Sequence, residues 1–267
     1  MARKEYFKAL VLGIVLTLLA LAAVMFPVRE EHTLVDLDSV PGYDLDRVRR
    51  TGLVVAPFID AIAVDFGNIT DNKERKAAFL RILLPLVIRE NQRLLLLRET
   101  VRRSPDTAAK ELGPRFGVDD GNRETLLRRI DIIPVSLALA QAAVESGWGT
   151  SRFVREGNSF FGERTFNSDD PGIKPRDADG SFRVLGFASI SHSVQSYMYN
   201  LNTHPAYAAL RRAREKSRRE HGAPRGGDLV PHLSVYAEDR EAYVKSVGRV
   251  MAQNRLGEFD GARLVGW

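Results

Sequence analysis

Apolar residues first cluster close to the N-terminus, in an uncharged run of 20 residues at positions 9–28. One crossing of a bilayer takes roughly 20 apolar residues, so this run predicts a single transmembrane helix. Arg3, Lys4 and Lys8 precede the run, and an excess of positive charge marks the cytoplasmic side. The pattern therefore predicts a short cytoplasmic segment at 1–8 and a signal anchor that leaves the rest of the chain outside the cytoplasm.

A cleaved signal peptide is the competing interpretation of the same run. Ala20-Leu21-Ala22 resembles a cleavage tripeptide, but it lies inside the apolar run instead of at its end. An uncleaved anchor in the inner (cytoplasmic) membrane is therefore favoured. Either interpretation places the remainder in an extracytoplasmic compartment, which is the periplasm in a cell with two membranes.

The polarity changes twice more before the middle of the chain. Residues 29–50 are mixed and polar, which predicts a stalk, whereas 51–130 shows apolar residues at helical spacing. Asp71 or Asn72 can cap the second helix of this part, because a short polar side chain accepts a hydrogen bond from a free backbone N–H. Pro85 lies within that helix and predicts a kink or a break.

Residues 131–260 form the predicted catalytic domain, and its first helix is expected at 131–144. This helix is rich in small apolar residues. Leu137, Gln141 and Glu145 follow one another at i, i+4 spacing, so they share one face of the helix. A glutamate is thereby presented at the end of an apolar helix.

The pattern after this helix alternates between polar and helical segments. Residues 167–186 are rich in Asp, Gly and Pro and predict a small hairpin or extended lobe. Helices are expected again at 191–210 and 236–254. Between them, 211–225 is strongly basic, which indicates either a solvated face or a surface for an anionic polymer. The predicted fold class is α+β, mainly α.

The composition of the chain excludes several kinds of functional site. The chain has 39 basic and 34 acidic residues, a net charge of +5, and no cysteine. Disulfides, thiolate metal sites and a cysteine nucleophile are thereby excluded. The five histidines show no metal-binding spacing, and there is no phosphate-binding loop or dinucleotide fingerprint. No metal and no organic cofactor is implied, and the extracytoplasmic placement disfavours nucleic acid as a partner.

Glu145 is the strongest candidate for chemistry. A charged group in apolar surroundings is costly, so burial raises the pKa of a carboxyl until it can donate a proton near neutral pH. Glu145 is preceded by Ala142 and Ala143, and the aromatic Trp148 follows three positions later. This is the setting of the general acid in a glycosidase. The plainer interpretation is an exposed glutamate at a helix end.

The segments AQAAVESGWGTSRF and GNSFFG resemble the glucosaminidase family, glycoside hydrolase family 73, which cleaves bacterial cell-wall glycan. SVQSYMYNLNTHPAYAALR and YAEDREAYVKSV are similar to the later helices of its Bax-like subgroup. The resemblance covers roughly residues 53–254. It implies a lysozyme-like catalytic domain with a small β-lobe, endo-β-N-acetylglucosaminidase activity, and Glu145 as the general acid.

A second catalytic group is harder to assign. The family is expected to carry it as a glutamate on the β-lobe, but residues 166–187 contain no glutamate. Asp177 in that lobe and Glu163 just before it are candidates, although an Asp beside a turn often serves only the turn. Tyr236 matches a family tyrosine that can orient water. The acetamido group of the substrate can also act as the nucleophile.

Further positions of the family motif are expected to contact the glycan. We predict substrate binding by Trp148, Asn158, Phe161, Gly162, Glu163 and Tyr243. The alternative for the aromatic members is ordinary core packing, because large apolar side chains are most often buried.

Two other functions are compatible with the same residues. A muramidase or lytic transglycosylase needs one catalytic glutamate on a similar scaffold. A non-catalytic glycan-binding or scaffold protein would fit a lobe that lacks its glutamate. In each case the expected partners are peptidoglycan glycan strands and the membrane that holds the N-terminal helix.

Overall fold

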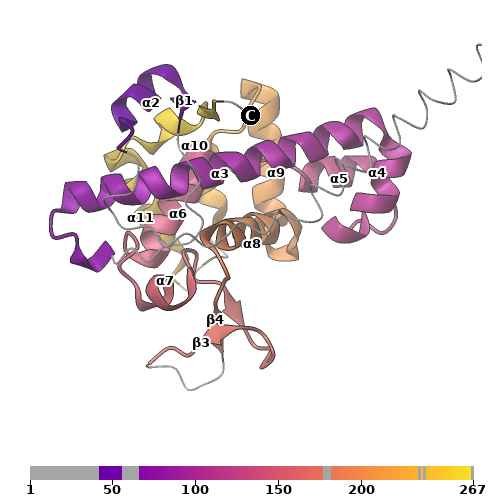
Figure 1. Cartoon of the computed structure of the whole chain (residues 1–267). Helices are drawn as coiled ribbons and strands as arrows, with labels where there is room; N and C mark the ends of the chain where they lie inside the picture. The colour runs from indigo at the N-terminus through magenta and orange to yellow at the C-terminus, as the bar shows by residue number, and fades with distance from the viewer. Residues whose placement is uncertain (1–41, 56–65, 177–181, 234–235, 237–238, 266–267) are drawn as a thin grey trace, which may run out of the picture. The chain divides into compact units, whose positions relative to one another are not determined.

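The computed structural model describes residues 42–55, 66–176, 182–233, 236 and 239–265. Its α-helices are α2 (Leu45–Thr51), α3 (Asn72–Arg103), α4 (Pro105–Leu112), α5 (Arg123–Arg129), α6 (Val135–Ser146), α7 (Arg152–Gly157), α8 (Ile190–Thr203), α9 (Ala208–His221), α10 (Gly226–Leu229) and α11 (Arg240–Gln253) (Figure 1). Short 3₁₀ helices are η2 (Phe66–Asn68), η3 (Pro114–Phe116), η4 (Pro205–Tyr207), η5 (Val230–Leu233) and η6 (Leu256–Phe259). The strands are β1 (Leu53–Val54), β2 (Arg164–Thr165), β3 (Gly172–Ile173), β4 (Arg183–Leu185) and β5 (Arg263–Leu264). The predicted class, mainly helical with a small β element, is confirmed.

The longest element, α3, crosses the whole view in Figure 1 and packs on α4, α6 and α8. Asp71 caps it by accepting hydrogen bonds of 2.8 Å from the amides of Lys73 and Glu74, as predicted. The helix continues through Pro85, so of the two predicted outcomes, a kink or a break, the break is wrong. A proline inside a helix destabilises the helix by about 3 kcal/mol. Its neighbours Leu84 and Leu86 are both buried here, and burial of each side chain stabilises the fold by about 2 kcal/mol. The two together outweigh the cost of the proline.

The centre of the molecule is α6, which contacts α3, α11, α10 and η6. The helix begins after Pro134 and ends at Gly147, whose φ of +58° is left-handed, the usual backbone of a residue that ends a helix. Every residue from Val135 to Ala143 is buried. Small alanines allow the neighbouring helices to approach closely, while the more polar end of α6 reaches the edge of the core. This arrangement places Glu145 where the core meets solvent.

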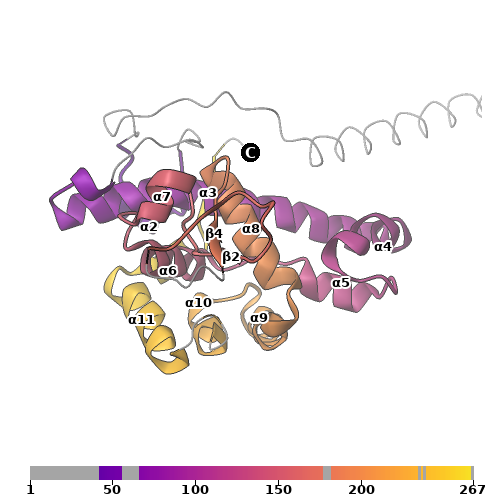
Figure 2. The same ribbon diagram turned by 90° about the horizontal axis from the view of Figure 1, so that it is seen from below.

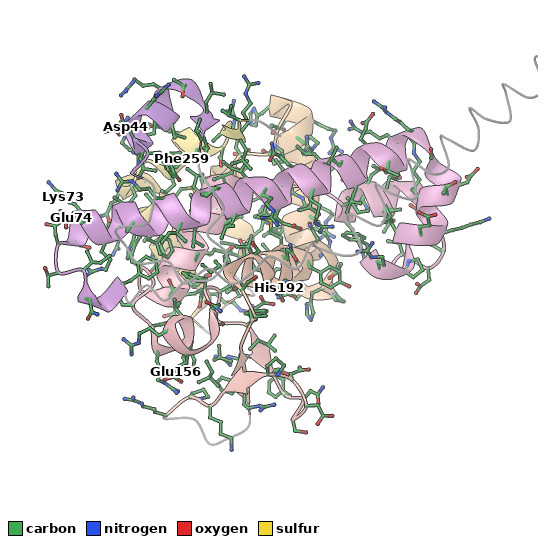
Figure 3. The ribbon with its side chains drawn as sticks, in the orientation of Figure 1. Asp44, Lys73, Glu74, Glu156, His192 and Phe259 are labelled. Carbon is green, nitrogen blue, oxygen red and sulfur yellow. The ribbon has the colours of Figure 1, made fainter. Side chains whose placement is uncertain are left out.

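The described part of the predicted stalk, residues 42–50, contains most of the folded helix α2, whereas 29–41 lies outside the described residues. Leu45 and Val48 on α2 are buried, because their helical spacing places both on the inner face. Arg49 stacks its guanidinium 4.6 Å from the ring centroid of Phe259, which lies next to α2 in Figure 3. β1 then pairs in parallel with β5. The polar residues of this segment are therefore the outer face of an amphipathic helix.

The predicted lobe after the catalytic motif is confirmed as a three-stranded antiparallel sheet in the order β2-β4-β3. Thr165 pairs with Arg183, and Gly172 pairs with Leu185. The lobe projects from the helices below α7 and α8 in Figure 1. Figure 2 shows α11, α10 and α9 in a row along one edge of the molecule.

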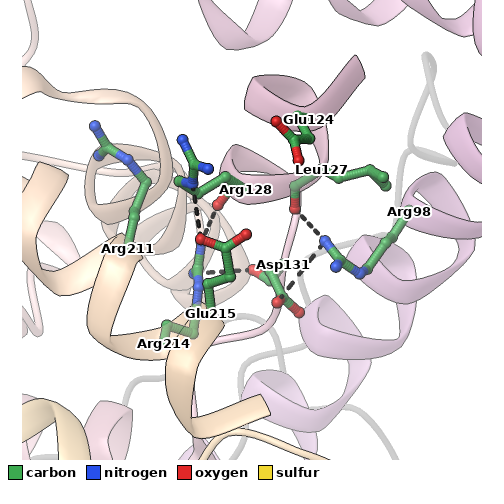
Figure 4. Close-up of a pocket in the computed structure, with 8 residues that line it drawn as sticks. All are labelled: Arg98, Glu124, Leu127, Arg128, Asp131, Arg211, Arg214 and Glu215. Carbon is green, nitrogen blue, oxygen red and sulfur yellow. Dashed lines mark hydrogen bonds and ion pairs between the residues drawn. The ribbon is translucent and has the colours of Figure 1, made fainter. Parts of the chain in front are cut away.

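The basic run at 211–225 forms most of α9, and it is only partly a solvated face. Arg211 and Arg214 are buried. Figure 4 shows Arg214 beside Asp131, with Arg98 and Arg128 around the same hollow. The periodicity of the run is helical, but nothing in its composition distinguishes these inner arginines from the outer ones.

In the described part of the chain, no helix is long and apolar enough to cross a membrane. The predicted transmembrane segment, 9–28, lies outside the described residues.

Candidate active site

Glu145 is half-buried in the last turn of α6. Burial raises the pKa of its carboxyl above the usual value, although a hydrogen bond from Tyr243 and the charge of Arg164 lower it in part. A carboxyl held in this balance is protonated over a wider pH range than an exposed one. The environment predicted for Glu145 is thus present.

A chain of hydrogen bonds orients this carboxyl. The Tyr197 hydroxyl donates to Gln141 Oε1 at 2.8 Å, and Gln141 Nε2 donates to the Tyr243 oxygen at 2.9 Å. Because the oxygen of Tyr243 already accepts this bond, its own proton is directed at Glu145. Gln141 and Glu145 serve one network from one face of α6, as their i, i+4 spacing predicts.

The loop from Phe161 to Gly162 closes over the same carboxyl. The Tyr236 hydroxyl donates to the Phe161 carbonyl at 2.9 Å, and the Tyr236 ring stacks on Tyr243 with centroids 5.3 Å apart. Gly162 has φ of +63°, and a Cβ at this position would lie 3.2 Å from Glu145 Oε2. A side chain at position 162 would therefore crowd the carboxyl, which explains the glycine.

Glu163 supplies a second buried carboxyl. Burial raises its pKa to about 7, and a hydrogen bond from Ser196 Oγ to its Oε2, 2.9 Å long, opposes the rise. Its other oxygen, Oε1, is buried and has no hydrogen-bond partner among the described residues. Burial, together with the charges of Glu163 and Glu145, raises the pKa of Tyr207 to about 12. The two glutamates therefore share one tyrosine-rich environment.

Three of the predicted binding residues face the core or hold the backbone. Trp148 follows α6, and its ring packs against α3, with its centroid 5.3 Å from that of Phe79. Phe161 is 1% exposed and stacks on Tyr197 at 3.9 Å. Asn158 ends α7 and donates from Nδ2 to the Phe187 carbonyl at 3.0 Å. Core packing, the alternative for the aromatic residues, is correct for Phe161, while the Phe161 carbonyl and Gly162 do line the site.

The other predicted site residues lie in different parts of the chain. Tyr236 and Tyr243 both reach the site. Asp177 lies outside the described residues, so its catalytic role stays a prediction. Among the residues that the structure does describe, no group of three or more His, Asp or Glu could hold a metal ion.

Tyr197, Ser196 and Tyr207 belong to the site but were not predicted. Their signal is weak, because the aromatic residues of α8 recur at the spacing of a buried helical face. One hint is available in retrospect: a buried tyrosine hydroxyl requires a partner. Gln141, buried on α6, requires one too.

Comparisons with known proteins identify the family of the chain. Residues 122–256 match the model of the glucosaminidase family, described as mannosyl-glycoprotein endo-beta-N-acetylglucosaminidase. The chain belongs to the glucosaminidase family. This family is one of glycoside hydrolases, so the chain carries a glycoside hydrolase domain, and the predicted membership in glycoside hydrolase family 73 is confirmed.

Two relatives can be named. Protein bax of Escherichia coli strain K12 is 33% identical over 197 residues, which cover 67% of this chain and 69% of that protein. The crystal structure of the catalytic domain of the autolysin Auto from Listeria monocytogenes matches with 21% identity and a TM-score of 0.37, covering 61% of this chain and 88% of that one.

Proposed function

We propose that this glycoside hydrolase cleaves peptidoglycan at the β-1,4 bond that follows N-acetylglucosamine, with Glu145 as general acid. The carrying observation is the half-buried Glu145 carboxyl, with its raised pKa and with the Tyr243 proton aimed at it. The membership of the chain in the glucosaminidase family supports the choice of substrate. A degenerate, non-catalytic site would have no need of this directed network.

In the proposed reaction, protonated Glu145 donates its proton to the leaving glycosidic oxygen while positive charge develops on the sugar ring. Glu145 becomes a carboxylate in the same step. The hydrogen bond from Tyr243 lowers the pKa of Glu145, so it favours this ionised form. Tyr243 thus stabilises the acid after it has given up its proton.

Glu163 takes the second acid–base role in this proposal. Its pKa of about 7 means that both its protonated and ionised forms are populated near neutral pH. Groups that titrate close to the working pH are the most effective in proton transfer. An ionised Glu163 would draw a proton from the attacking water. Asp177 and the acetamido group of the substrate are the competing candidates.

Product analysis tests the function directly. Purified peptidoglycan digested by the full chain and examined by mass spectrometry should show new reducing N-acetylglucosamine ends. Reducing muramic acid ends would instead indicate a muramidase, and 1,6-anhydromuramyl ends a lytic transglycosylase. Absence of any product from a well-folded chain would contradict the proposed activity.

Replacing Glu163 by Gln should change how stability depends on pH. The folded pKa is about 7 and the unfolded value 4.5, so between these values the folded state holds a proton that the unfolded state has lost. The contribution of Glu163 to the free energy of unfolding is therefore most favourable below about pH 4.5. It declines by about 3 kcal/mol as the pH rises to about 7. Urea unfolding of wild type and Glu163→Gln from pH 4 to 8 should show the variant gaining relative stability as the pH rises.

A matched control is Glu156→Gln, the same chemical change at an exposed position on α7. Its unfolding free energy should run parallel to that of wild type across this range. Parallel curves for Glu163→Gln as well would contradict the assigned environment. The activity profile of Glu163→Gln should also lose its titration near pH 7.

The proposed location is the inner membrane, with the catalytic domain in the periplasm or its extracytoplasmic equivalent. The support is the uncharged run at 9–28 and the basic residues before it. Peptidoglycan as substrate requires the same placement. Fractionation of cells followed by protease treatment of intact spheroplasts should degrade the domain while cytoplasmic markers survive.

A further inference from the structure

Phe166 stands out on the surface of the lobe. Its side chain is 78% exposed, more than any other large apolar side chain that the structure describes. Burying a phenylalanine contributes about 1.5–3 kcal/mol, and this position forgoes that gain. Single exposed apolar residues are common, so the significance of Phe166 depends on its surroundings.

A second ring and a cation accompany it. Phe182 directly precedes β4, as Phe166 directly follows β2, and the two ring centroids are 6.5 Å apart. The Arg164 guanidinium is 4.3 Å from the centroid of Phe182. Arg164 begins β2 and Phe166 directly follows that strand, and both side chains lie against the ring of Phe182. The three side chains form a continuous surface, which we call the aromatic wall.

The aromatic wall adjoins the candidate active site. Arg164 directly follows Glu163 in the chain, and its charge lowers the pKa of Glu145. Glu163 is fixed in the site by Ser196 on α8, and the next residue, Arg164, stacks on Phe182, so the wall begins at the edge of the site. A polymer that places one bond at Glu145 therefore meets the wall with a neighbouring unit.

The loop that carries Phe166 is held in place before any ligand binds. Thr165 Oγ1 donates to Asp170 Oδ2 at 2.5 Å. One Arg183 nitrogen donates to three carbonyl oxygens of the loop, at 2.7–2.9 Å, those of Asn167, Ser168 and Asp170. A side chain that is already ordered loses little entropy on binding. The exposed ring is thus displayed by a rigid loop.

We propose that the aromatic wall binds a sugar ring of the glycan strand, at a position next to the bond that is cleaved. The proposal rests on the function proposed above. The C–H face of a pyranose is apolar and fits an aromatic ring, and Arg164 can donate hydrogen bonds to hydroxyl or carboxylate oxygens at the rim. The patch is small and surrounded by the polar residues 167–169, which suits one sugar unit better than a protein partner, whose interface takes about 800 Å² per side.

The test uses Glu145→Gln as the parent, so that the glycan is bound without being cut. Its apparent Kd for purified peptidoglycan is measured by co-sedimentation, and Phe166→Ala and Phe182→Ala are added in turn. Each should raise the apparent Kd about five- to tenfold. Phe166→Trp should stay within about twofold, because it keeps an aromatic face. Leu96→Ala, at a 64%-exposed apolar position on α3, is the matched control and should change nothing.

The outcomes separate the two proposals. An unchanged Kd for both phenylalanine variants, with a parent that binds, overturns the aromatic wall and leaves the proposed function intact. If Leu96→Ala raises the apparent Kd as much as the phenylalanine variants do, the aromatic wall is overturned too. Failure of the parent to bind, together with no cleavage by wild type, overturns both. In the active chain, Phe166→Ala should raise KM and leave kcat unchanged, and equal melting temperatures would exclude a folding defect.

Discussion

Glu145→Gln should reduce kcat for peptidoglycan cleavage by about a hundred- to ten-thousandfold. The amide keeps the shape of the side chain and can still accept the hydrogen bond from Tyr243, but it has no proton to give to the leaving oxygen. Glycan binding should therefore be nearly unchanged. The measurement is the rate of reducing-end release from peptidoglycan, together with co-sedimentation to follow binding.

A loss of folding stability cannot explain this decrease in kcat. Because burial raises the pKa of Glu145, its ionised form is the costly one, and a neutral glutamine removes that cost above the usual pKa of a glutamate. The variant should unfold at the same urea concentration as wild type or a higher one at pH 7. Glu156→Gln removes a carboxyl that pairs with Arg152 on the exposed side of α7, and it should retain full activity. Residual activity above one tenth of wild type would contradict Glu145 as the acid and direct attention to Glu163.

The part of this site that could be predicted from sequence is the part that depends on local geometry. An i, i+4 spacing on a helix places Gln141 and Glu145 on one face regardless of what surrounds them. The small apolar residues of α6 predict its burial in the same way. Gly162 was expected in the site from the family motif, and the structure supplies its physical reason, the 3.2 Å between its absent Cβ and Glu145 Oε2.

Contacts between distant elements could not be predicted in this way. Tyr197 on α8 reaches Gln141 across 56 positions, and nothing in the spacing of α8 says which of its aromatic residues carries a satisfied hydroxyl. The contact of Trp148 with α3 could not be predicted for a related reason. Its backbone φ of +58° turns the chain sharply after α6, and its ring packs against Phe79 of α3. Turn geometry and the position of α3 decide this together.

Outside the site, too, contacts between distant elements decide what the local sequence pattern does not. Leu45 and Val48 were too few to indicate a helix within a polar stretch, yet α2 packs on η6 and β1, and both residues are buried there. The basic run contains both exposed and buried arginines, and the residue type alone does not tell them apart. The arrangement of backbone carbonyls around α9 decides which arginine is buried.

Arg214→Met should destabilise the fold by about 3–5 kcal/mol, the range observed when one partner of a buried charged cluster is removed. Arg214 is 0% exposed. Its guanidinium donates to the carbonyl oxygens of Arg128, Asp131 and Ile132 at 2.8–3.2 Å. It also donates to Asn202 Oδ1 at 2.5 Å. Methionine has similar length but leaves these four acceptors without that donor, and each unsatisfied buried group costs about 1–3 kcal/mol.

Loss of the guanidinium also affects Asp131. Burial alone would raise the pKa of this carboxyl, but Arg214 and Arg218 hold it below its usual value. Without Arg214 the buried carboxylate loses part of that compensation. Its folded pKa should rise, so the stability difference between the variant and wild type should become smaller as the pH falls, because protonation neutralises the carboxylate that lost its partner. Urea unfolding at pH 7 and pH 5 measures both effects.

Arg212→Met is the matched control, because Arg212 lies on the exposed side of the same helix and should cost less than about 0.5 kcal/mol. A difference below about 1 kcal/mol between the two variants would contradict a structural role for Arg214. The consequence extends to the active site. Asp131 and Ile132, whose carbonyls Arg214 holds, lead into α6, and α6 carries Glu145 at its far end. The buried arginine of the basic run therefore supports the helix that positions the acid, and Arg214→Met should lose activity in proportion to the fraction of molecules that unfold.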